Sequence, residues 1–515
     1  MTRSVAARHY RRIFDSRSPE QRRALAHVKR FMERLLGDPA FRLALGENLD
    51  SARRSAERYG IDVDPGEMLP LWHSQYQCHR HGPEGAQWPL AVLWDDYMAE
   101  MLRHREVMRE EGDMADVHPR FHIWRQRQMR RCASELGSSA AWITHPIIAF
   151  ELSDGCTVGC WFCGVAADRF RGHYAYSDQH ARLWRGLVGA ARDLFGPAAR
   201  TGFCYWATDP IDNPDYDKFL FDYYDITGAL PQTTTAAPLK DLALTRRVLA
   251  LFDRYRTISN RFSVLSLRQL DAIHAAFTAE ELLGVELIMQ QKDSPVPKAD
   301  AGRARLVRQR LQERGKDDGK EARWIENTTI ACVSGFLVNL LRGRIQLITP
   351  VAESGRWPLG YRILGERFFA TVAEFRAGLE GLIDQHMRAG LAPDQPVRFR
   401  RDLAYEQGDG AFALAGRRVR HTVQDDATAV PIGPLIAGSA KTASEVLAAV
   451  GGGDMLVAAD LLDQLFDAGL LEEDFDDRFA GAQNEGLALA RRDHGAVAPR
   501  HRDPSAHNYA WDTPA

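Results

Sequence analysis

The sequence has no long apolar run, little net charge and few cysteines. No uninterrupted stretch of about 18 apolar residues occurs in the 515-residue chain, so we expect no membrane-spanning helix and no membrane partner. The formal net charge of −3 produces no overall basic field, which argues against nucleic acid as a partner. The arginine-rich N-terminus lacks the apolar segment of a secretory signal, and we therefore expect a cytoplasmic protein.

Seven cysteines in a chain of this length, without an export signal, do not indicate a disulfide framework. Four of them are scattered along the chain, namely Cys78, Cys132, Cys204 and Cys332. The other three, Cys156, Cys160 and Cys163, fall within eight residues. Cysteines grouped in this way in an intracellular protein are typical of a metal or catalytic site.

The apolar pattern predicts an α/β protein built from five consecutive segments. Residues 1–140 repeat apolar positions every three or four residues, which indicates a helical N-terminal region. Residues 141–360 alternate short apolar runs with helical stretches, which predicts βαβ units and a partial (β/α) barrel with its chemistry at the carboxyl ends of the strands. We expect a helical connector at 361–395, a small winged-helix-like α+β domain at 396–477 and a disordered tail at 478–515. The expected barrel strands are 142–154, 201–208, 232–237, 261–267, 284–290 and 327–339.

The three grouped cysteines have the spacing C-x3-C-x2-C and follow the first predicted barrel strand. Three thiolates on one loop can hold three corners of a [4Fe–4S] cluster and leave the fourth iron without a protein ligand. Phe162, just before the third cysteine, completes a motif that resembles the signature of the radical S-adenosylmethionine (SAM) superfamily. The alternative is a structural zinc site, which would need a fourth Cys or His at similar spacing. The resemblance implies one [4Fe–4S] cluster and SAM as cofactors, with Cys156, Cys160 and Cys163 as the cluster ligands.

The same resemblance suggests which residues would bind SAM. In the superfamily, a glycine-rich turn with a carboxylate usually follows the second barrel strand and receives the SAM amino group. Here Ala207, Thr208 and Asp209 stand at that place instead, and Asp209 would supply the acceptor. An Asp-Pro turn that merely ends a strand is the simpler alternative. Ser263 or Ser266, on the fourth predicted strand, would contact the ribose or the carboxylate of SAM.

Longer stretches resemble a narrower family. CWFCGVAADRF, FCYWATDPIDNPDY, TTTAAPLKD, FSVLSL and TIACVSGFLVN are similar to the radical SAM peptide epimerases, which convert L-residues to D-residues in proteusin-type ribosomal peptides. The resemblance covers about residues 142–350 and implies that a cysteine outside the cluster motif returns a hydrogen atom to the substrate. Cys332 matches that position, with Cys204 as the reserve donor, whereas an inert core thiol is the alternative. It also implies a precursor peptide with leader and core as substrate, and a reducing partner such as flavodoxin.

The segment 396–477 has predicted strands followed by helices, an order that resembles the leader-binding element of peptide-modifying enzymes. Such a domain binds an extended leader by adding it as a strand to an exposed sheet edge, and residues 416–420 are the candidate edge. A generic winged helix or a capping domain is the alternative. A DNA-binding winged helix is disfavoured, because residues 454–477 contain nine acidic residues and no basic one.

Two other functions fit parts of the pattern. A radical SAM core can also form a C–C or thioether cross-link in a peptide, or methylate it, and a donor cysteine does not exclude these outcomes. A zinc-stabilised peptide-binding protein without catalysis would explain the three cysteines but not the longer resemblance. Peptide epimerisation is the leading hypothesis.

Overall fold

The computed structural model describes residues 4–46, 48–113, 118–291, 294, 296, 298–313, 315, 325–326, 328–424, 432–438, 441–450, 455–473, 476–495. Within these residues, no helix combines the length and the apolar character needed to span a bilayer. The part of the predicted tail from 496 to 515 lies outside the described residues.

The N-terminal region is helical, as predicted, and it forms its own apolar clusters. Its helices are α1 (Val5–Asp15), α2 (Pro19–Gly37), α3 (Pro39–Leu45), α4 (Leu49–Arg58), α5 (Leu69–Trp72), α6 (Pro89–Glu111) and α7 (Pro119–Leu136). Short 3-10 turns are η1 (Pro65–Met68), η2 (Ser74–His79), η3 (Pro83–Gln87), η4 (Gly137–Trp142), η5 (Gly196–Thr201) and η6 (Pro210–Asp212). The helix α2 ends where α3 begins because Asp38 accepts hydrogen bonds from the Ala40 and Phe41 amides and caps α3.

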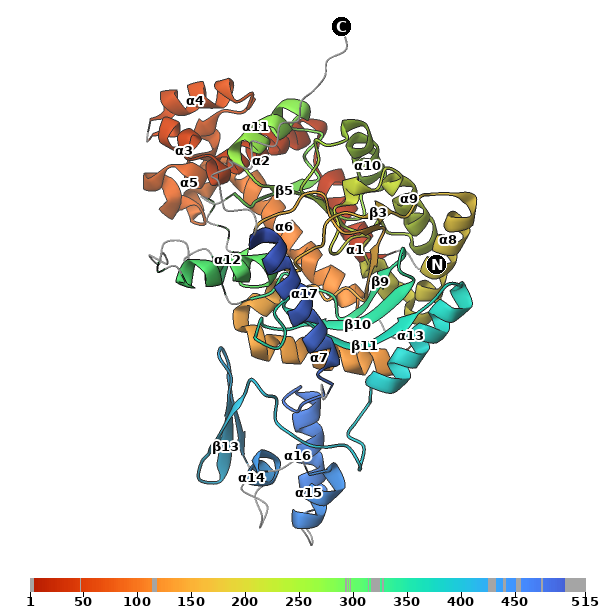
Figure 1. Ribbon diagram of the computed structural model, residues 1–515. Helices are drawn as coiled ribbons and strands as arrows, with labels where there is room; N and C mark the ends of the chain where they lie inside the picture. Colours follow the sequence, from red (N-terminus) through yellow and green to blue (C-terminus); the bar gives the residue numbers. More distant parts are fainter. Residues whose placement is uncertain are drawn as a thin grey trace.

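The central region is a mixed α/β structure (Figure 1). Its strands are β1 (Ile148–Glu151), β2 (Ser153–Asp154), β3 (Gly172–His173), β4 (Thr233–Thr235), β5 (Asn260–Val264), β6 (Val285–Met289), β7 (Lys298–Ala299), β8 (Ile325–Glu326), β9 (Gly335–Asn339), β10 (Arg344–Pro350) and β11 (Tyr361–Phe368). Its helices are α8 (Asp178–Phe195), α9 (Tyr216–Thr227), α10 (Leu242–Tyr255), α11 (Leu267–Ala276), α12 (Gly302–Glu313) and α13 (Val372–His386). One sheet has the order β1-β9-β10-β11 and another the order β4-β5-β6.

Parallel strand pairs occur in both of these sheets. The strands β1 and β9 are parallel neighbours, and β4, β5 and β6 are parallel to one another. Phe203 joins the two groups, because it makes parallel bridges to Ala149 in β1 and to Gln232 before β4. Helices α8, α9 and α13 cover one face of this array with a large apolar core. The opposite face holds a second apolar cluster that includes Phe203, Leu337 and Tyr361.

Three sequence predictions about this region are wrong. Residues 201–208 form only the bridges of Phe203, not a full strand. The last predicted strand begins at Gly335, so Cys332 precedes the strand, because Thr329 accepts a hydrogen bond from the Ala331 amide and holds this segment in a turn. The expected helical connector begins with β11, whose residues pair with the antiparallel β10, and only α13 is helical.

The C-terminal residues form a separate α+β unit with its own apolar core. Its elements are β12 (Ala404–Gln407), β13 (Ala411–Ala415), β14 (Arg420–Gln424), α14 (Ile432–Ala437), α15 (Ala443–Val450) and α16 (Met455–Asp467). Strands therefore precede helices, as the sequence indicates, and Figure 1 shows the unit below the main body.

The expected disordered tail instead begins with helix α17 (Arg478–Gly495), which crosses the main body (Figure 1). A narrow apolar stripe hidden in a polar sequence explains the difference, because Phe479 and Ala480 join the cluster around Tyr361. The side-chain amide of Gln483 also donates to the Tyr361 carbonyl (3.0 Å).

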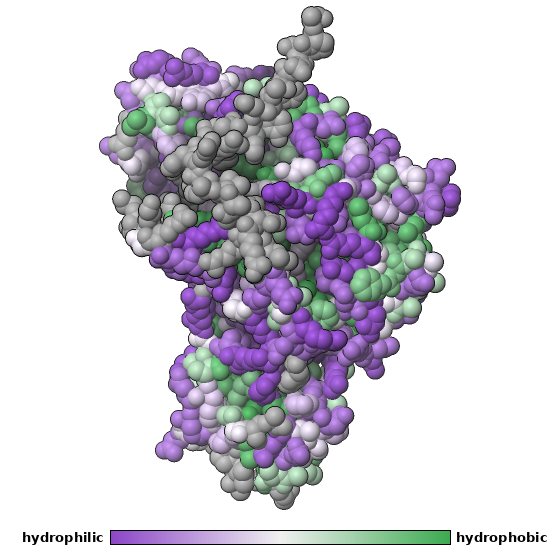
Figure 2. All heavy atoms as spheres, viewed as in Figure 1, coloured by the Kyte–Doolittle hydropathy of each residue, from purple (hydrophilic) through white to green (hydrophobic). Residues whose placement is uncertain are grey.

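Buried charges on α7 connect the C-terminal unit to the main body. Glu135 accepts from Arg131 (3.0 Å) in its own helix and pairs with Arg362 of β11 (3.4 Å). Arg131 also pairs with Glu472, beyond α16 (3.2 Å). The side chains of these ion pairs are almost completely buried. Figure 2 shows hydrophilic residues on the surface where the main body narrows toward the C-terminal unit. A desolvated ion network therefore contributes to fixing the junction.

We expect Glu135→Ala to destabilise the protein by about 3–5 kcal/mol, because the buried guanidinium groups lose the carboxylate that compensates them. Urea unfolding measures this change. The matched control is Glu380→Ala, which breaks a half-exposed pair with Arg376 (3.2 Å) and should cost about 0–1 kcal/mol. Equal shifts in the two variants would contradict the importance of the buried network.

Candidate functional site

The three grouped cysteines lie on a loop that follows β1 and β2, called here the cysteine loop (residues 155–164). The loop leaves the sheet beside residues 168–169: the Cys156 amide donates to the Asp168 carbonyl (2.9 Å). Two thiols accept backbone hydrogen bonds, Cys156 from Val158 and Cys163 from Ala167, both at 3.4 Å. Such N–H···S bonds stabilise thiolates and tune the iron–sulfur clusters that thiolates hold.

The start of α12 supports the cysteine loop from a distant part of the chain. The Arg303 amide donates to the Cys163 carbonyl (2.9 Å), and the Arg303 guanidinium donates to the carbonyls of Cys160 (3.1 Å) and Ala167. Gly302 has a φ of +53°, and a Cβ there would collide with the carbonyls of Cys163 and Gly164. Only glycine therefore allows α12 to approach the loop this closely.

A buried carboxylate fixes the other side of the loop. Asp212 accepts from the Thr157 amide (2.8 Å) and from the Thr157 hydroxyl (2.6 Å). Lys240 donates to the same carboxylate (2.5 Å), and the Asp212 side chain has no exposed surface. Sequence reasoning missed both Asp212 and Arg303; Asp212 lies in the stretch that carries the family resemblance, but its spacing gave no signal.

The three thiols are close enough to influence one another. Burial raises the pKa of Cys156 to about 12, and burial together with Cys163 and Cys156 raises the pKa of Cys160. Within the described residues, no group of three or more His, Cys, Asp or Glu side chains is gathered closely enough to hold a metal ion. Three thiols, two of which accept backbone hydrogen bonds, are nevertheless the donor type that holds three corners of a [4Fe–4S] cluster, which spaces its ligands more widely than a single ion does. Phe162 lies beside Trp161 on the same loop.

The predicted SAM-binding turn lies near the cysteine loop. Asp209 adds to the raised pKa of Cys156, which places its carboxylate near that thiol. Its oxygens already accept from the Thr235 hydroxyl (2.7 Å) and from the Ala236 amide (2.8 Å). Burial raises the pKa of Asp209 to about 6 despite these donors. The role of Asp209 as acceptor for the SAM amino group stays a prediction.

A second buried carboxylate, Glu151, borders this turn. It ends β1, and its oxygens accept from the Ala207 amide (3.0 Å) and from the side-chain amide of Asn339 in β9 (2.9 Å). Burial raises the pKa of Glu151, although these donors oppose the shift. Thr208, next to Ala207, is half-buried. No motif or spacing in the sequence singles out Glu151.

The two predicted serines occupy different structural positions. Ser263 lies within β5 and is half-buried. Ser266 is the N-cap of α11, and its hydroxyl accepts from the Gln269 amide (3.1 Å). A capping role is a sufficient structural reason for Ser266. Contact of either serine with SAM stays a prediction.

Cys332 lines a cavity of about 380 Å³ between helices α2 and α6 and the amino ends of β1, β4 and β5. Four methionines on α2 and α6 give this cavity an adaptable apolar wall: Met32, Met98, Met101 and Met108. Its floor also holds an ion pair between Arg261 and Glu286 (3.0 Å). Burial raises the pKa of the Cys332 thiol to about 12, and Arg261 opposes the shift. Cys332 is therefore a protonated thiol at neutral pH.

The segment 330–334 connects this cavity with the cysteine loop. A Cβ on Gly164 would lie 2.8 Å from the Ile330 side chain, so Ile330 is beside the loop. Ser334, at the other end, donates its amide to the Pro146 carbonyl before β1 (3.1 Å). Cys332 lies between these two anchors.

The other unassigned cysteines differ from Cys332 in their surroundings. Cys204 is 1% exposed and belongs to the core under α8 and α9. Cys132 is completely buried, and Cys78 is exposed. Of the two donor candidates, Cys332 is the one that faces a cavity.

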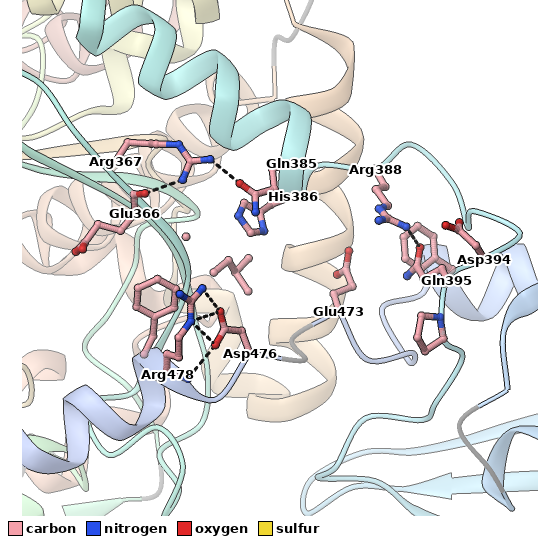
Figure 3. Close-up of a pocket in the computed structure, with 15 residues that line it drawn as sticks. Glu366, Arg367, Gln385, His386, Arg388, Asp394, Gln395, Glu473, Asp476 and Arg478 are labelled. Atoms are coloured by element: carbon pink, nitrogen blue, oxygen red, sulfur yellow. Dashed lines mark hydrogen bonds and ion pairs between the residues drawn. The ribbon is translucent and has the colours of Figure 1, made fainter.

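A larger cavity, of about 630 Å³, lies between β11, α13 and the chain that follows the C-terminal unit (Figure 3). Its polar groups pair with one another: Arg478 with Asp476 (2.6 Å) and Arg388 with Gln395 (2.9 Å). The residues that line it include none of the predicted site residues. We therefore place the candidate site at the cysteine loop and the Cys332 cavity.

In the metal-free protein we expect iodoacetamide to alkylate Cys332 at pH 8 at least about a hundredfold more slowly than the exposed Cys78. A raised pKa keeps the thiol protonated, so its thiolate fraction and its rate should increase about tenfold per pH unit between pH 7 and 9. Peptide mass spectrometry after timed quenching measures both rates in one sample. A Cys332 rate equal to that of Cys78, or one independent of pH, would contradict the assigned environment.

Comparison with known proteins shows which family the chain belongs to. A family profile described as "Protein y4wI C-terminal domain" matches residues 397–469. The solved structure of BtrN in complex with AdoMet and 2-DOIA aligns with 39% of this chain and 72% of the BtrN chain, at 13% sequence identity and a TM-score of 0.25. The chain is 60% identical over 481 residues to "Uncharacterized protein y4wI" of Sinorhizobium fredii (strain NBRC 101917 / NGR234), with 93% of each protein covered. The chain therefore belongs to the y4wI family.

Proposed function

We propose that this protein is a radical SAM enzyme that epimerises residues of a ribosomally made precursor peptide. The observation that carries the proposal is a protonated thiol, Cys332, lining a cavity and joined by a short segment to a loop with three cysteines in C-x3-C-x2-C spacing. The parallel strands β9, β1, β4, β5 and β6, linked by Phe203, would be the partial barrel that surrounds the site.

The cysteine loop would hold the cofactors. Cys156, Cys160 and Cys163 would ligate three irons of a [4Fe–4S] cluster, and the turn at Ala207 and Asp209 would receive SAM at the open iron. When bound, these cofactors supply a 5′-deoxyadenosyl radical, which removes a hydrogen atom from an unreactive carbon. The residues of the chain would exclude water and orient the substrate for this step.

Cys332 would supply the returning hydrogen atom. Loss of the Cα hydrogen leaves a near-planar carbon radical on the substrate, and inversion requires a hydrogen atom from the opposite face. A thiol S–H bond is weak enough to give up that atom, but only while the thiol is protonated. The raised pKa of Cys332 meets this condition at neutral pH. The cavity that Cys332 lines lies at the amino ends of the strands, whereas the cysteine loop follows the carboxyl end of β1. A peptide bound between them would therefore face the cofactors on one side and the Cys332 thiol on the other.

The reaction would be directional without an energy-rich cofactor. An inverted residue presents its Cα hydrogen to the wrong side, so it is a poor substrate for a second abstraction. The thiyl radical left on Cys332 must be reduced before the next cycle, which requires a one-electron donor such as flavodoxin.

The C-terminal unit would bind the leader peptide. Its sheet has the order β12-β13-β14, so β12 and β14 are edges that can accept an extended peptide as an added strand. The predicted edge at 416–420 is mostly the turn before β14, which begins at Arg420. We therefore assign the edge to β14 itself.

Co-expression in heavy water with a precursor peptide encoded next to the gene tests the reaction. We expect one deuterium at each inverted Cα, because the donor thiol exchanges with solvent before it returns its hydrogen. Mass spectrometry should show this label with the wild type and with Cys204→Ala, and at least about a tenfold loss of it with Cys332→Ala.

Other outcomes of this experiment separate the alternatives. Label that survives Cys332→Ala but is lost in Cys204→Ala would move the donor to Cys204. A changed peptide mass in ordinary water would indicate cross-linking or methylation, and zinc in place of iron and sulfide would indicate a non-catalytic binding protein.

We expect Asp212→Asn to lower the affinity of the loop for its cluster by about tenfold, because residues that orient metal ligands contribute on this scale. The amide keeps the shape of the carboxylate but loses one acceptor for Thr157 and the charge that holds Lys240. Iron and acid-labile sulfide per chain, measured after reconstitution at limiting iron, report the change. The matched control is Asp217→Asn, which removes a carboxylate on α9 that pairs with Arg247 of α10 (2.8 Å). Equal iron content in the two variants would count against the role of Asp212.

A further inference from the structure

Four aromatic side chains form a continuous row inside the central region, called here the aromatic row: Tyr205, Phe203, Trp206 and Tyr361. The ring of Phe203 is 4.7 Å from that of Tyr205 and stacks on that of Trp206 at 6.3 Å. The ring of Trp206 meets that of Tyr361 edge-on at 5.5 Å. All four belong to the apolar cluster that also contains Cys332.

One end of the aromatic row lies at the proposed hydrogen donor. Tyr205 and Cys332 line the same cavity, and the charge of a Cys332 thiolate would contribute to the raised pKa of Tyr205. Burial is the main cause of that shift, which brings the pKa to about 12. The Tyr205 hydroxyl donates to Gln232 (2.6 Å) and lies 2.8 Å from the Thr234 hydroxyl.

The other end lies at the cysteine loop. The Gly302 amide donates a hydrogen bond to the carbonyl of Pro358, three residues before Tyr361 (2.9 Å). Gly302 is in turn pressed against the carbonyls of Cys163 and Gly164. Burial raises the pKa of Tyr361 to about 12, and Cys163 adds to the shift. The aromatic row therefore spans the interior from the cavity to the loop.

The proposed function leaves one requirement that this row can meet. Each epimerisation would end with a thiyl radical on Cys332, and a peptide bound in the cavity would separate that radical from a reductant in solvent. We propose that the aromatic row restores the Cys332 thiol, with Tyr205 returning the hydrogen atom and the row carrying the electron that regenerates Tyr205. This inference rests on the proposed function.

The restoring step balances in atoms and electrons. The O–H bond of Tyr205 breaks and the S–H bond of Cys332 forms, which moves one hydrogen atom and leaves a tyrosyl radical. One electron, delivered along Trp206 and Tyr361 from an external flavodoxin-class reductant, and one proton from the polar side at Thr234, then restore the phenol. Phenol O–H and thiol S–H bonds are similar in strength, so the exchange needs little driving force. Phe203 serves only as a bridge between the redox-active rings.

Another tyrosine of the same cavity provides a matched control. Tyr97 lines the cavity from α6 but packs against Trp94 and Phe14, outside the aromatic row. Tyr97→Phe therefore removes a cavity hydroxyl without interrupting the row, whereas Tyr205→Phe removes the proposed hydrogen source.

The experiment uses reconstituted holoenzyme, SAM, a flavodoxin reductant and the same precursor peptide in heavy water. For Tyr205→Phe we expect a first phase of about one labelled residue per enzyme, equal to the first turnover of the wild type, followed by a rate at least tenfold lower. A spin trap should give a sulfur-centred adduct on Cys332, detected by electron paramagnetic resonance and located by mass spectrometry. Wild type and Tyr97→Phe should continue turnover without this adduct.

Trp206→Phe is the second variant, and it should slow later turnovers while leaving the first intact. Wild-type steady-state labelling in both Tyr205→Phe and Trp206→Phe, without a trapped sulfur radical, would overturn the relay and leave the epimerase intact. Absence of label in the wild type itself would overturn the proposed function, and the relay with it. The two failures are therefore distinguishable.

Discussion

The parallel pairing of β1 with β9 is the constraint on which the candidate site depends. It aligns residues 148–151 with residues 336–339, so it closes a loop of well over a hundred residues. Complete burial of both strands and their joint contribution to the core offset the entropy of that closure. The buried hydrogen bond from Asn339 to Glu151 (2.9 Å) gives the pair a polar contact that a slip in register would break.

From this pairing follows the placement of the chemical groups. The cysteine loop leaves the carboxyl end of β1, and the segment that carries Cys332 enters at the amino end of β9. A parallel pair necessarily puts these two at different ends, and the interior cluster with Phe203 and Tyr361 fills the space between them. The proposed epimerisation uses this separation. The cofactors at the cysteine loop would remove a hydrogen atom from one face of the substrate Cα, and Cys332 would return one to the opposite face.

The C-terminal unit is attached to this framework by charge rather than by a shared core. Its apolar cluster is separate, and the junction depends on Arg131 and Glu135 of α7 with partners on both sides. A desolvated ion network is rigid in geometry, since each charge loses much if its partner moves. A leader bound at β14 would therefore be held at a defined distance from the site.

The sequence by itself determined the cysteine group, the helical N-terminal region, the alternation of strands and helices and the strands-then-helices order of the C-terminal unit. These features follow from local spacing and periodicity. Only the tertiary structure decided that Asp212 and Arg303 hold the cysteine loop. It also decided that Cys332 precedes its strand and faces a cavity, whereas Cys204 is buried in the core. The start of the polar tail as helix α17 is a third feature of this kind. The reason is that each of these facts depends on partners far away in the chain, which no local pattern encodes.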